Sequence, residues 1–142
     1  GDVFGKLGLH VAQILLTHED LKPRARHLSA RHTLDTLLAR GIVPIINEND
    51  TVAVEEIKFG DNDRLGALTA TLMGADALII LSHVPGLLQD GRVVAVVPEI
   101  THEIERLAGG TDRATSVGGM KSKIDAAATS PFKLAVELSM AM

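Results

Sequence analysis

The chain has 142 residues, of which 46% are hydrophobic and 23% are charged, and these values are typical of one globular domain rather than of a disordered chain. Aromatic residues make up only 2%, the net charge is −4 and no basic tract occurs, so a protein that binds nucleic acid by stacking and charge is not expected. The absence of cysteine excludes disulfides, thiolate catalysis and cysteine-based zinc sites.

The apolar runs are shorter than the roughly 20 residues that a membrane span requires. No charged and then apolar signal segment opens the sequence, and the lack of cysteine fits a cytoplasmic protein. We therefore expect a cytoplasmic protein without a membrane partner. Because the chain begins at Gly1 rather than at a methionine, and ends at Met142 within an apolar pattern, we also expect it to be a piece of a longer protein.

The first half of the chain predicts two strands with a helix between them. The apolar run "VAQILLT", residues 11–17, fits a buried strand or a helix end, and a loop is expected over residues 18–24. Leucines at near-helical spacing over residues 24–40 predict an amphipathic helix, which ends at Gly41. The continuous run "IVPII", residues 42–46, predicts a strand buried on both faces, as in parallel sheets.

The second half continues the alternation of strands and helices, which is typical of the α/β class. We predict helices over residues 63–75, 100–108, 120–130 and 131–142, and strands over residues 76–82 and 92–97. Turn residues at Asp90-Gly91 and an N-cap at Thr101 support these boundaries. In such sheets, ligands bind beyond the carboxyl ends of the strands.

Two polar clusters lie at the ends of these predicted elements. "NEND", residues 47–50, follows a strand, and "GDND", residues 60–63, precedes a helix. Their carboxylates and amides could hold an amino group, orient a lysine or bind Mg²⁺ through water. Turn and cap chemistry would explain each cluster alone. Their shared position beside the expected ligand crevice favours a binding role.

A glycine-rich segment, "SVGGMKSK" over residues 116–123, leads directly into a predicted helix. Adjacent glycines and a helix N-terminus together suit a phosphate chain. Lys121 and Lys123 fall in the first turn, where the helix dipole disfavours cations, and this indicates an anion nearby. A solvated surface loop explains the same residues equally well. The histidines show no metal-ligand spacing, so no metal site built by the protein alone is expected.

The string "GIVPIINENDTVAVEEIKFGDNDRLGALTATLMGADALIILS" closely resembles the glutamate 5-kinases of the amino acid kinase family. The similarity continues into "VPGLLQDGRV" and "SVGGMKSKIDAA" and covers most of the chain, residues 11–128. "PIINENDTVA" followed by "FGDND" is specific, because related acetylglutamate, aspartate and uridylate kinases share the fold without this pair. The resemblance implies an α/β, three-layer amino acid kinase-like fold with a mainly parallel central sheet, of which the N-terminal part is missing here.

The resemblance also implies a reaction. The family transfers the γ-phosphoryl group of ATP, with Mg²⁺, to the side-chain carboxylate of L-glutamate, which opens proline biosynthesis. Residues 1–142 would be a partial amino acid kinase domain, with a glutamate-pocket segment at 41–63 and a nucleotide-binding part at 64–130. The partners would be L-glutamate, ATP and further copies of the chain in a homo-oligomer, but neither nucleic acid nor a membrane.

Individual roles follow from the same resemblance. Asp50 and Asn62 would contact glutamate, and three further residues would shape that pocket: Asn47, Asn49 and Asp61. Asp63 would orient catalytic lysines, and Lys123 would neutralise charge on the transferring phosphoryl group. The nucleotide would lie against a longer set of residues: Ser82, His83, Val117, Gly118, Gly119, Met120, Lys121, Ser122 and Lys123.

Three features depart from the family pattern. Ser82-His83 stands where the family usually has Thr-Asp, and Val117 stands where it usually has Thr. The strand with Lys-x-Gly-Ser and the Ser-Ser-Gly-Ala segment, which supply a catalytic lysine and a substrate-binding serine in the family, do not occur in this chain. A catalytically inactive amino-acid or nucleotide sensor of the same fold, and a kinase of another small carboxylate, are therefore the alternatives.

Overall fold

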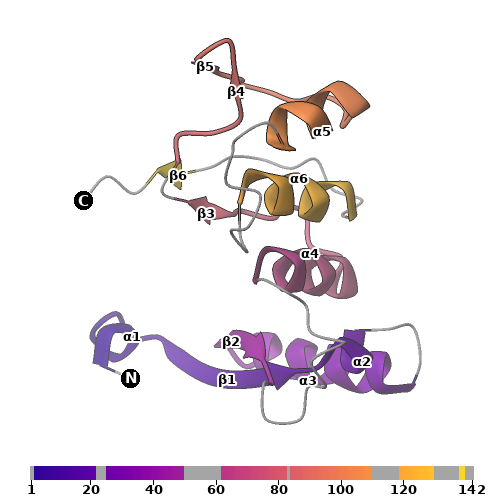
Figure 1. Ribbon diagram of the computed structural model, residues 1–142. Helices are drawn as coiled ribbons and strands as arrows, with labels where there is room; N and C mark the ends of the chain where they lie inside the picture. The colour runs from indigo at the N-terminus through magenta and orange to yellow at the C-terminus, as the bar shows by residue number, and fades with distance from the viewer. Residues whose placement is uncertain are drawn as a thin grey trace. The chain divides into compact units, whose positions relative to one another are not determined.

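The computed structural model describes residues 2–21, 25–49, 62–82, 84–109, 119–129 and 138–139 (Figure 1). The chain divides into two compact units, Gly1–Phe59 and Gly60–Met142. Both units mix helices with strands, and two of the three strand pairs in the described ranges are parallel, which confirms the predicted α/β class. Within the same ranges, every helix is too short or too polar to cross a membrane.

The first unit is built around one parallel strand pair. Its elements in chain order are α1 (Asp2–Lys6), β1 (His10–Leu16), α2 (His18–Leu21), α3 (Ala25–Ala39) and β2 (Ile42–Glu48). β1 and β2 pair in parallel from His10 opposite Ile42 to Leu16 opposite Glu48. Parallel neighbours need a long connection between them, and α3 provides it and packs against β2. The strands at 11–17 and 42–46 are thus confirmed.

The helix predicted over residues 24–40 is confirmed as α3, and Gly41, with φ +70°, ends it as expected. Fewer of its leucines are buried than their near-helical spacing predicted. Leu34 is 1% exposed, whereas Leu28 and Leu38 are 68% and 52% exposed. Leu28 lies about 120° around the helix from Leu34, and Leu38 shares the face of Leu34 but stands in the last turn.

Two expectations for this unit were wrong in part. Residues 18–21 form the helical turn α2 rather than a loop, because the Asp20 carboxylate accepts hydrogen bonds from the Thr17 N–H at 2.7 Å and the Thr17 hydroxyl at 2.6 Å. β2 is not buried on both faces within the described residues. Its burial alternates along the strand, and Val43 and Ile45 are 36% and 42% exposed, because α3 covers one face only.

The second unit contains three longer helices and four two-residue strands among its described residues. In chain order they are α4 (Asn62–Met73), β3 (Leu81–Ser82), β4 (Leu88–Gln89), β5 (Arg92–Val93), α5 (His102–Gly109), α6 (Met120–Thr129) and β6 (Leu138–Ser139). The helices predicted over residues 63–75, 100–108 and 120–130 are thereby confirmed. Helix α6 contacts both α4 and α5 and lies between them (Figure 1).

The strands of this unit are shorter than predicted. β3 begins at Leu81 rather than at residue 76, because its ladder extends only over the two residues that pair in parallel with β6. The final helix predicted over residues 131–142 is wrong at Leu138–Ser139, where β6 forms; its other residues lie outside the described ranges. An apolar run of this length fits either element, and pairing with β3 decides in favour of a strand.

A tight hairpin connects β4 and β5. Asp90 and Gly91 both have positive φ, +51° and +75°, which is the geometry of a type I′ turn. The Val94 N–H donates to the Leu87 carbonyl at 2.8 Å, so one further backbone hydrogen bond joins the two chain segments at the open end of the hairpin. The turn is confirmed, but the strand predicted over residues 92–97 ends at Val93.

An apolar cluster joins this hairpin to helices α5 and α6. Its buried members are Leu87, Ala108 and Ile124, and partly buried side chains surround them: Val94, Val97, Ile100, Ile104, Leu107 and Met120. The predicted cap at Thr101 is confirmed, because its carbonyl accepts from the Glu105 N–H at 3.0 Å and its hydroxyl from the Ile104 N–H at 3.5 Å. The cluster fixes the position of α6, on which the candidate site depends.

Candidate functional site

An ion pair joins two helices of the second unit. Lys123 Nζ lies 2.8 Å from Asp63 Oδ2, although 60 residues separate the two positions in sequence. Asp63 stands in the first turn of α4, and Lys123 stands near the start of α6. The side chains of Lys123 and Asp63 are only 14% and 16% exposed, so water screens this pair less than a surface pair. Both residues were predicted as site residues, and the structure brings them together.

Ser122 reaches the same carboxylate. Its hydroxyl donates to Asp63 Oδ2 at 3.4 Å, beside the bond from Lys123. A helix turns by about 100° per residue, so Ser122, Lys123 and Ala126 share one side of α6. Ala126 is 1% exposed, and the buried residues of α4 include Ala67 at 0%. Small buried side chains let the two helices approach closely and keep Asp63 within reach of both donors.

The surroundings of this carboxylate favour a bound anion. Asp63 and Lys123 both stand near the N-terminal ends of their helices, where unpaired N–H groups give a partial positive charge. Helix α6 carries no acidic residue in its first turn. One carboxylate therefore faces a lysine and two helix N-termini, and a phosphate group could bind there.

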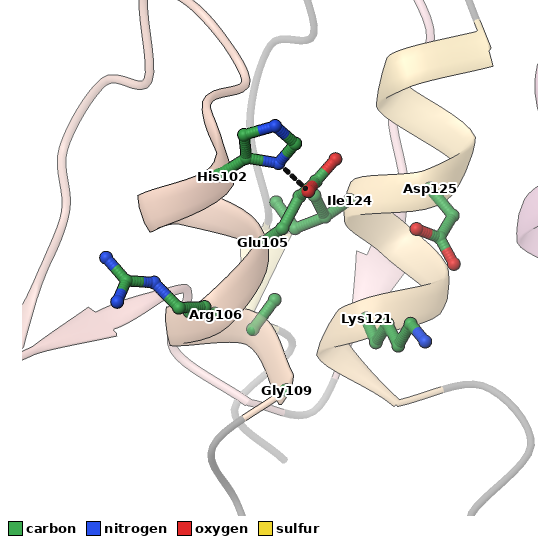
Figure 2. Close-up of a pocket in the computed structure, with 8 residues that line it drawn as sticks. His102, Glu105, Arg106, Gly109, Lys121, Ile124 and Asp125 are labelled. Atoms are coloured by element: carbon green, nitrogen blue, oxygen red, sulfur yellow. Dashed lines mark hydrogen bonds and ion pairs between the residues drawn. The ribbon is translucent and has the colours of Figure 1, made fainter.

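Lys121 has a different environment from Lys123. It lines an open hollow of about 560 Å³ between α5 and α6, together with Ile124 and Asp125 of its own helix. Figure 2 shows Ile124 between the two helices, with residues of α5 on the other side. The Lys121 position is exposed, and about 200° of helix rotation separates it from Lys123. The structure therefore does not bring the two predicted lysines together.

The α5 side of this hollow carries mixed charge. His102 Nδ1 lies 3.0 Å from Glu105 Oε2, the pair drawn with a dashed line in Figure 2, and Arg106 lies one residue beyond. The His102 side chain is 99% exposed, so this pair is a surface contact. The sequence shows no sign of this hollow, because its residues come from two helices that share no motif.

The residues predicted for the glutamate pocket fall in both units. In the first unit, Asn47 is exposed near the carboxyl end of β2, and the N–H of Asn49, just beyond the strand, donates to the Leu16 carbonyl at 2.9 Å. In the second unit, Asn62 begins α4 and is exposed. Asp50 and Asp61 lie outside the described residues.

The residues predicted to line the nucleotide take several roles in the second unit. Ser82 ends β3, and its hydroxyl accepts from the Val84 N–H at 3.5 Å. The Gly119 carbonyl accepts from the Lys123 N–H at 3.4 Å, at the start of α6. The Met120 side chain packs against the apolar cluster. His83, Val117 and Gly118 lie outside the described residues.

Comparison with known proteins places these features in a family. Residues 1–130 match the amino acid kinase family. The chain is 53% identical to a glutamate 5-kinase of Syntrophotalea carbinolica over 133 residues, which are 89% of this chain and 36% of the relative. A glutamate 5-kinase of Myxococcus xanthus is 48% identical over 134 residues, again 89% and 36%. One from Carboxydothermus hydrogenoformans is 48% identical over 146 aligned residues, 98% of this chain and 38% of the relative. The chain spans little more than a third of the length of these curated relatives.

Proposed function

Because the chain belongs to the amino acid kinase family, we propose that it forms the nucleotide-binding part and a portion of the glutamate pocket of a glutamate 5-kinase. The complete protein transfers the γ-phosphoryl group of ATP to the side-chain carboxylate of L-glutamate and yields glutamyl 5-phosphate for proline biosynthesis. The observation that carries this proposal is the Asp63–Lys123 pair at the N-terminal ends of α4 and α6. It supplies a fixed cation where an anion can bind.

The reaction requires alignment and charge neutralisation rather than a general base. The glutamate carboxylate is already a nucleophile, and it must approach a phosphoryl group of the same charge sign. Lys123 would reduce this repulsion as charge develops in the transition state. Because Asp63 holds the lysine side chain before the substrates arrive, little reorganisation remains for the reaction itself.

The residues present fit a magnesium nucleotide. ATP supplies the phosphoryl group, and the segment from Gly119 to Lys123 would hold its phosphates at the start of α6, whose first turn contains no acid. Among the described residues, no three His, Asp or Glu side chains come close enough to enclose a metal ion. Proteins commonly hold Mg²⁺ through substrate phosphates and water with one or two carboxylates, so the nucleotide itself would bring the ion to the site.

Glutamate recognition would use the two polar clusters. We assign Asp50 and Asn62 to direct contact with the substrate, and Asn47, Asn49 and Asp61 to the walls of its pocket. The pocket segment at 41–63 then includes the boundary between the two compact units, and the nucleotide-binding part at 64–130 lies within the second unit. A carboxylate that binds the substrate ammonium explains Asp50 better than capping alone.

Hydroxylamine capture of the acyl phosphate tests the proposal on the complete protein. With ATP, Mg²⁺ and L-glutamate, hydroxamate should accumulate, whereas reactions without ATP or with L-glutamine should give none, since glutamine has no side-chain carboxylate. Hydroxamate with another small carboxylate instead of glutamate would redirect the assignment to that acceptor. Saturable binding of ATP or glutamate without any hydroxamate would overturn the kinase proposal in favour of an inactive binding module.

A further inference from the structure

Ser122 carries a side chain that the proposed chemistry has not used. Its hydroxyl donates to Asp63 Oδ2 at 3.4 Å, and Lys123 Nζ donates to the same oxygen at 2.8 Å. Adjacent positions of one helix thus supply two donors to a single carboxylate oxygen. The Lys123 and Asp63 side chains are largely shielded from water, because they are only 14% and 16% exposed.

A second donor on this oxygen restricts the orientation of the carboxylate. The last torsion of an aspartate side chain is broad, so an ion pair alone could use either carboxylate oxygen. Ser122 has a short side chain attached to a helical backbone, and its hydroxyl can reach only a small region. When it donates to Oδ2, it favours one oxygen and one orientation of Asp63 over the others.

The orientation of Asp63 in turn decides where the lysine ammonium rests. Lys123 reaches Asp63 through a flexible four-carbon stem, which by itself allows many positions for Nζ. An ammonium has three N–H donors, and the bond to Oδ2 uses one of them. A fixed acceptor therefore sets the direction of the remaining two donors, which could then point toward an incoming phosphoryl oxygen.

We propose that Ser122 is a positioning residue, which acts through Asp63 to hold the Lys123 ammonium toward the transferring phosphoryl group. This inference rests on the proposed kinase function and deepens it. It also changes the role that the sequence resemblance implied for Ser122, from a side chain that contacts the nucleotide to one that organises the catalytic lysine.

Kinetics of the complete protein test the proposal. Ser122→Ala should lower kcat roughly three- to tenfold, the loss expected for one long hydrogen bond to a charged acceptor, with the KM for ATP unchanged. Ser122→Thr, which keeps the hydroxyl, should restore most of that loss. In an Asp63→Asn background, Ser122→Ala should cause little further loss, because the residue acts through Asp63. Thr129→Ala is the matched control, because the Thr129 hydroxyl donates to the Asp125 carbonyl elsewhere on the same helix.

Two kinetic outcomes would overturn the inference. A raised KM for ATP with an unchanged kcat in Ser122→Ala would mean that the hydroxyl binds the nucleotide directly. If Ser122→Ala lowers kcat by the same factor in the unsubstituted protein and in the Asp63→Asn background, Ser122 acts independently of Asp63.

A measurement that needs no turnover separates this inference from the kinase assignment. Reductive methylation with formaldehyde, followed by mass spectrometry, reports how firmly each lysine is held. Ser122→Ala should speed methylation of Lys123 about two- to fivefold and leave exposed Lys121 as the internal reference, while Ser122→Thr should match the unsubstituted protein. An unchanged rate at Lys123 would overturn the positioning role even if hydroxamate forms. An absence of hydroxamate together with faster methylation would reject the kinase and retain the Ser122–Asp63–Lys123 coupling.

Discussion

Lys121 and Lys123 lie two residues apart on α6 but face different parts of the molecule. Lys123 pairs with Asp63 of α4 at 2.8 Å, whereas Lys121 is exposed beside the hollow between α5 and α6. The separation follows from helix geometry, since two residues correspond to about 200° of rotation. Among the residues that the structure describes, only Lys123 is held by a carboxylate of a neighbouring helix, so substitution of the two lysines should have unequal effects.

Lys123→Ala should lower kcat of the complete protein by at least about a hundredfold, because a preorganised cation that acts mainly in the transition state is lost. Lys121→Ala should instead raise the KM for ATP by a factor below about ten and leave kcat nearly unchanged. This is the result expected when the lost interaction is equally strong in the ground state and the transition state. Steady-state kinetics of both variants in the hydroxamate assay measure this contrast. Equal losses of kcat would contradict the division of roles between the two lysines.

Asp63→Asn should destabilise the protein by about 1–3 kcal/mol, because it leaves the largely buried Lys123 ammonium without its counter-charge. The matched control is Asp35→Asn. Asp35 pairs with Arg31 at 3.7 Å, but the side chains of Arg31 and Asp35 are 51% and 56% exposed, so a change below about 0.5 kcal/mol is expected. Urea denaturation of both variants gives the comparison.

A second substitution distinguishes loss of the ion pair from loss of other contacts of Asp63. Lys123→Met in the Asp63→Asn background removes the unpaired ammonium and should recover part of the lost stability. If the double variant is instead less stable by the full sum of the two single effects, the pair does not contribute to stability as a unit.

Local sequence patterns predicted much of the fold. The short apolar run before α3 and the β-branched run after Gly41 form β1 and β2, since apolar strands that flank a helix pair in parallel. Asp90-Gly91 formed the expected turn, and the structure shows it to be of type I′, because both residues tolerate positive φ. The prediction failed at Leu138–Ser139, where a partner strand more than 50 residues away determines the structure. No local pattern carries that information.

The candidate site likewise combines residues that the sequence indicated with contacts that it could not indicate. The resemblance named Asp63 and Lys123, and the structure brings their side chains together. It could not indicate that Ser122 shares their carboxylate, because this contact depends on the rotation of α6 against α4. Nor could a motif of consecutive residues indicate that Lys121 lines the hollow between α5 and α6. The roles of Asp50, Asn62 and the other pocket residues stay predictions.

Leu34→Ala tests the core of the first unit. Leu34 is 1% exposed, and its truncation should cost about 2–5 kcal/mol through lost burial and the cavity that remains. Leu28→Ala makes the same chemical change on the same helix, but Leu28 is 68% exposed and the cost should stay below about 0.5 kcal/mol. Both are measured by urea denaturation followed by circular dichroism. Similar costs for the two variants would show that α3 packs through a different face.

Ala67→Leu tests whether close packing of α4 on α6 keeps Asp63 and Lys123 together. Ala67 is fully buried, so three added carbon atoms must push neighbouring groups apart and should cost about 1–3 kcal/mol. Methylation of Lys123 should become faster as its carboxylate moves away. Ala128→Leu adds the same atoms at an exposed position of α6 and should change neither stability nor methylation. If Ala67→Leu destabilises the protein while Lys123 stays protected, the helices yield elsewhere, and the ion pair does not depend on their close approach.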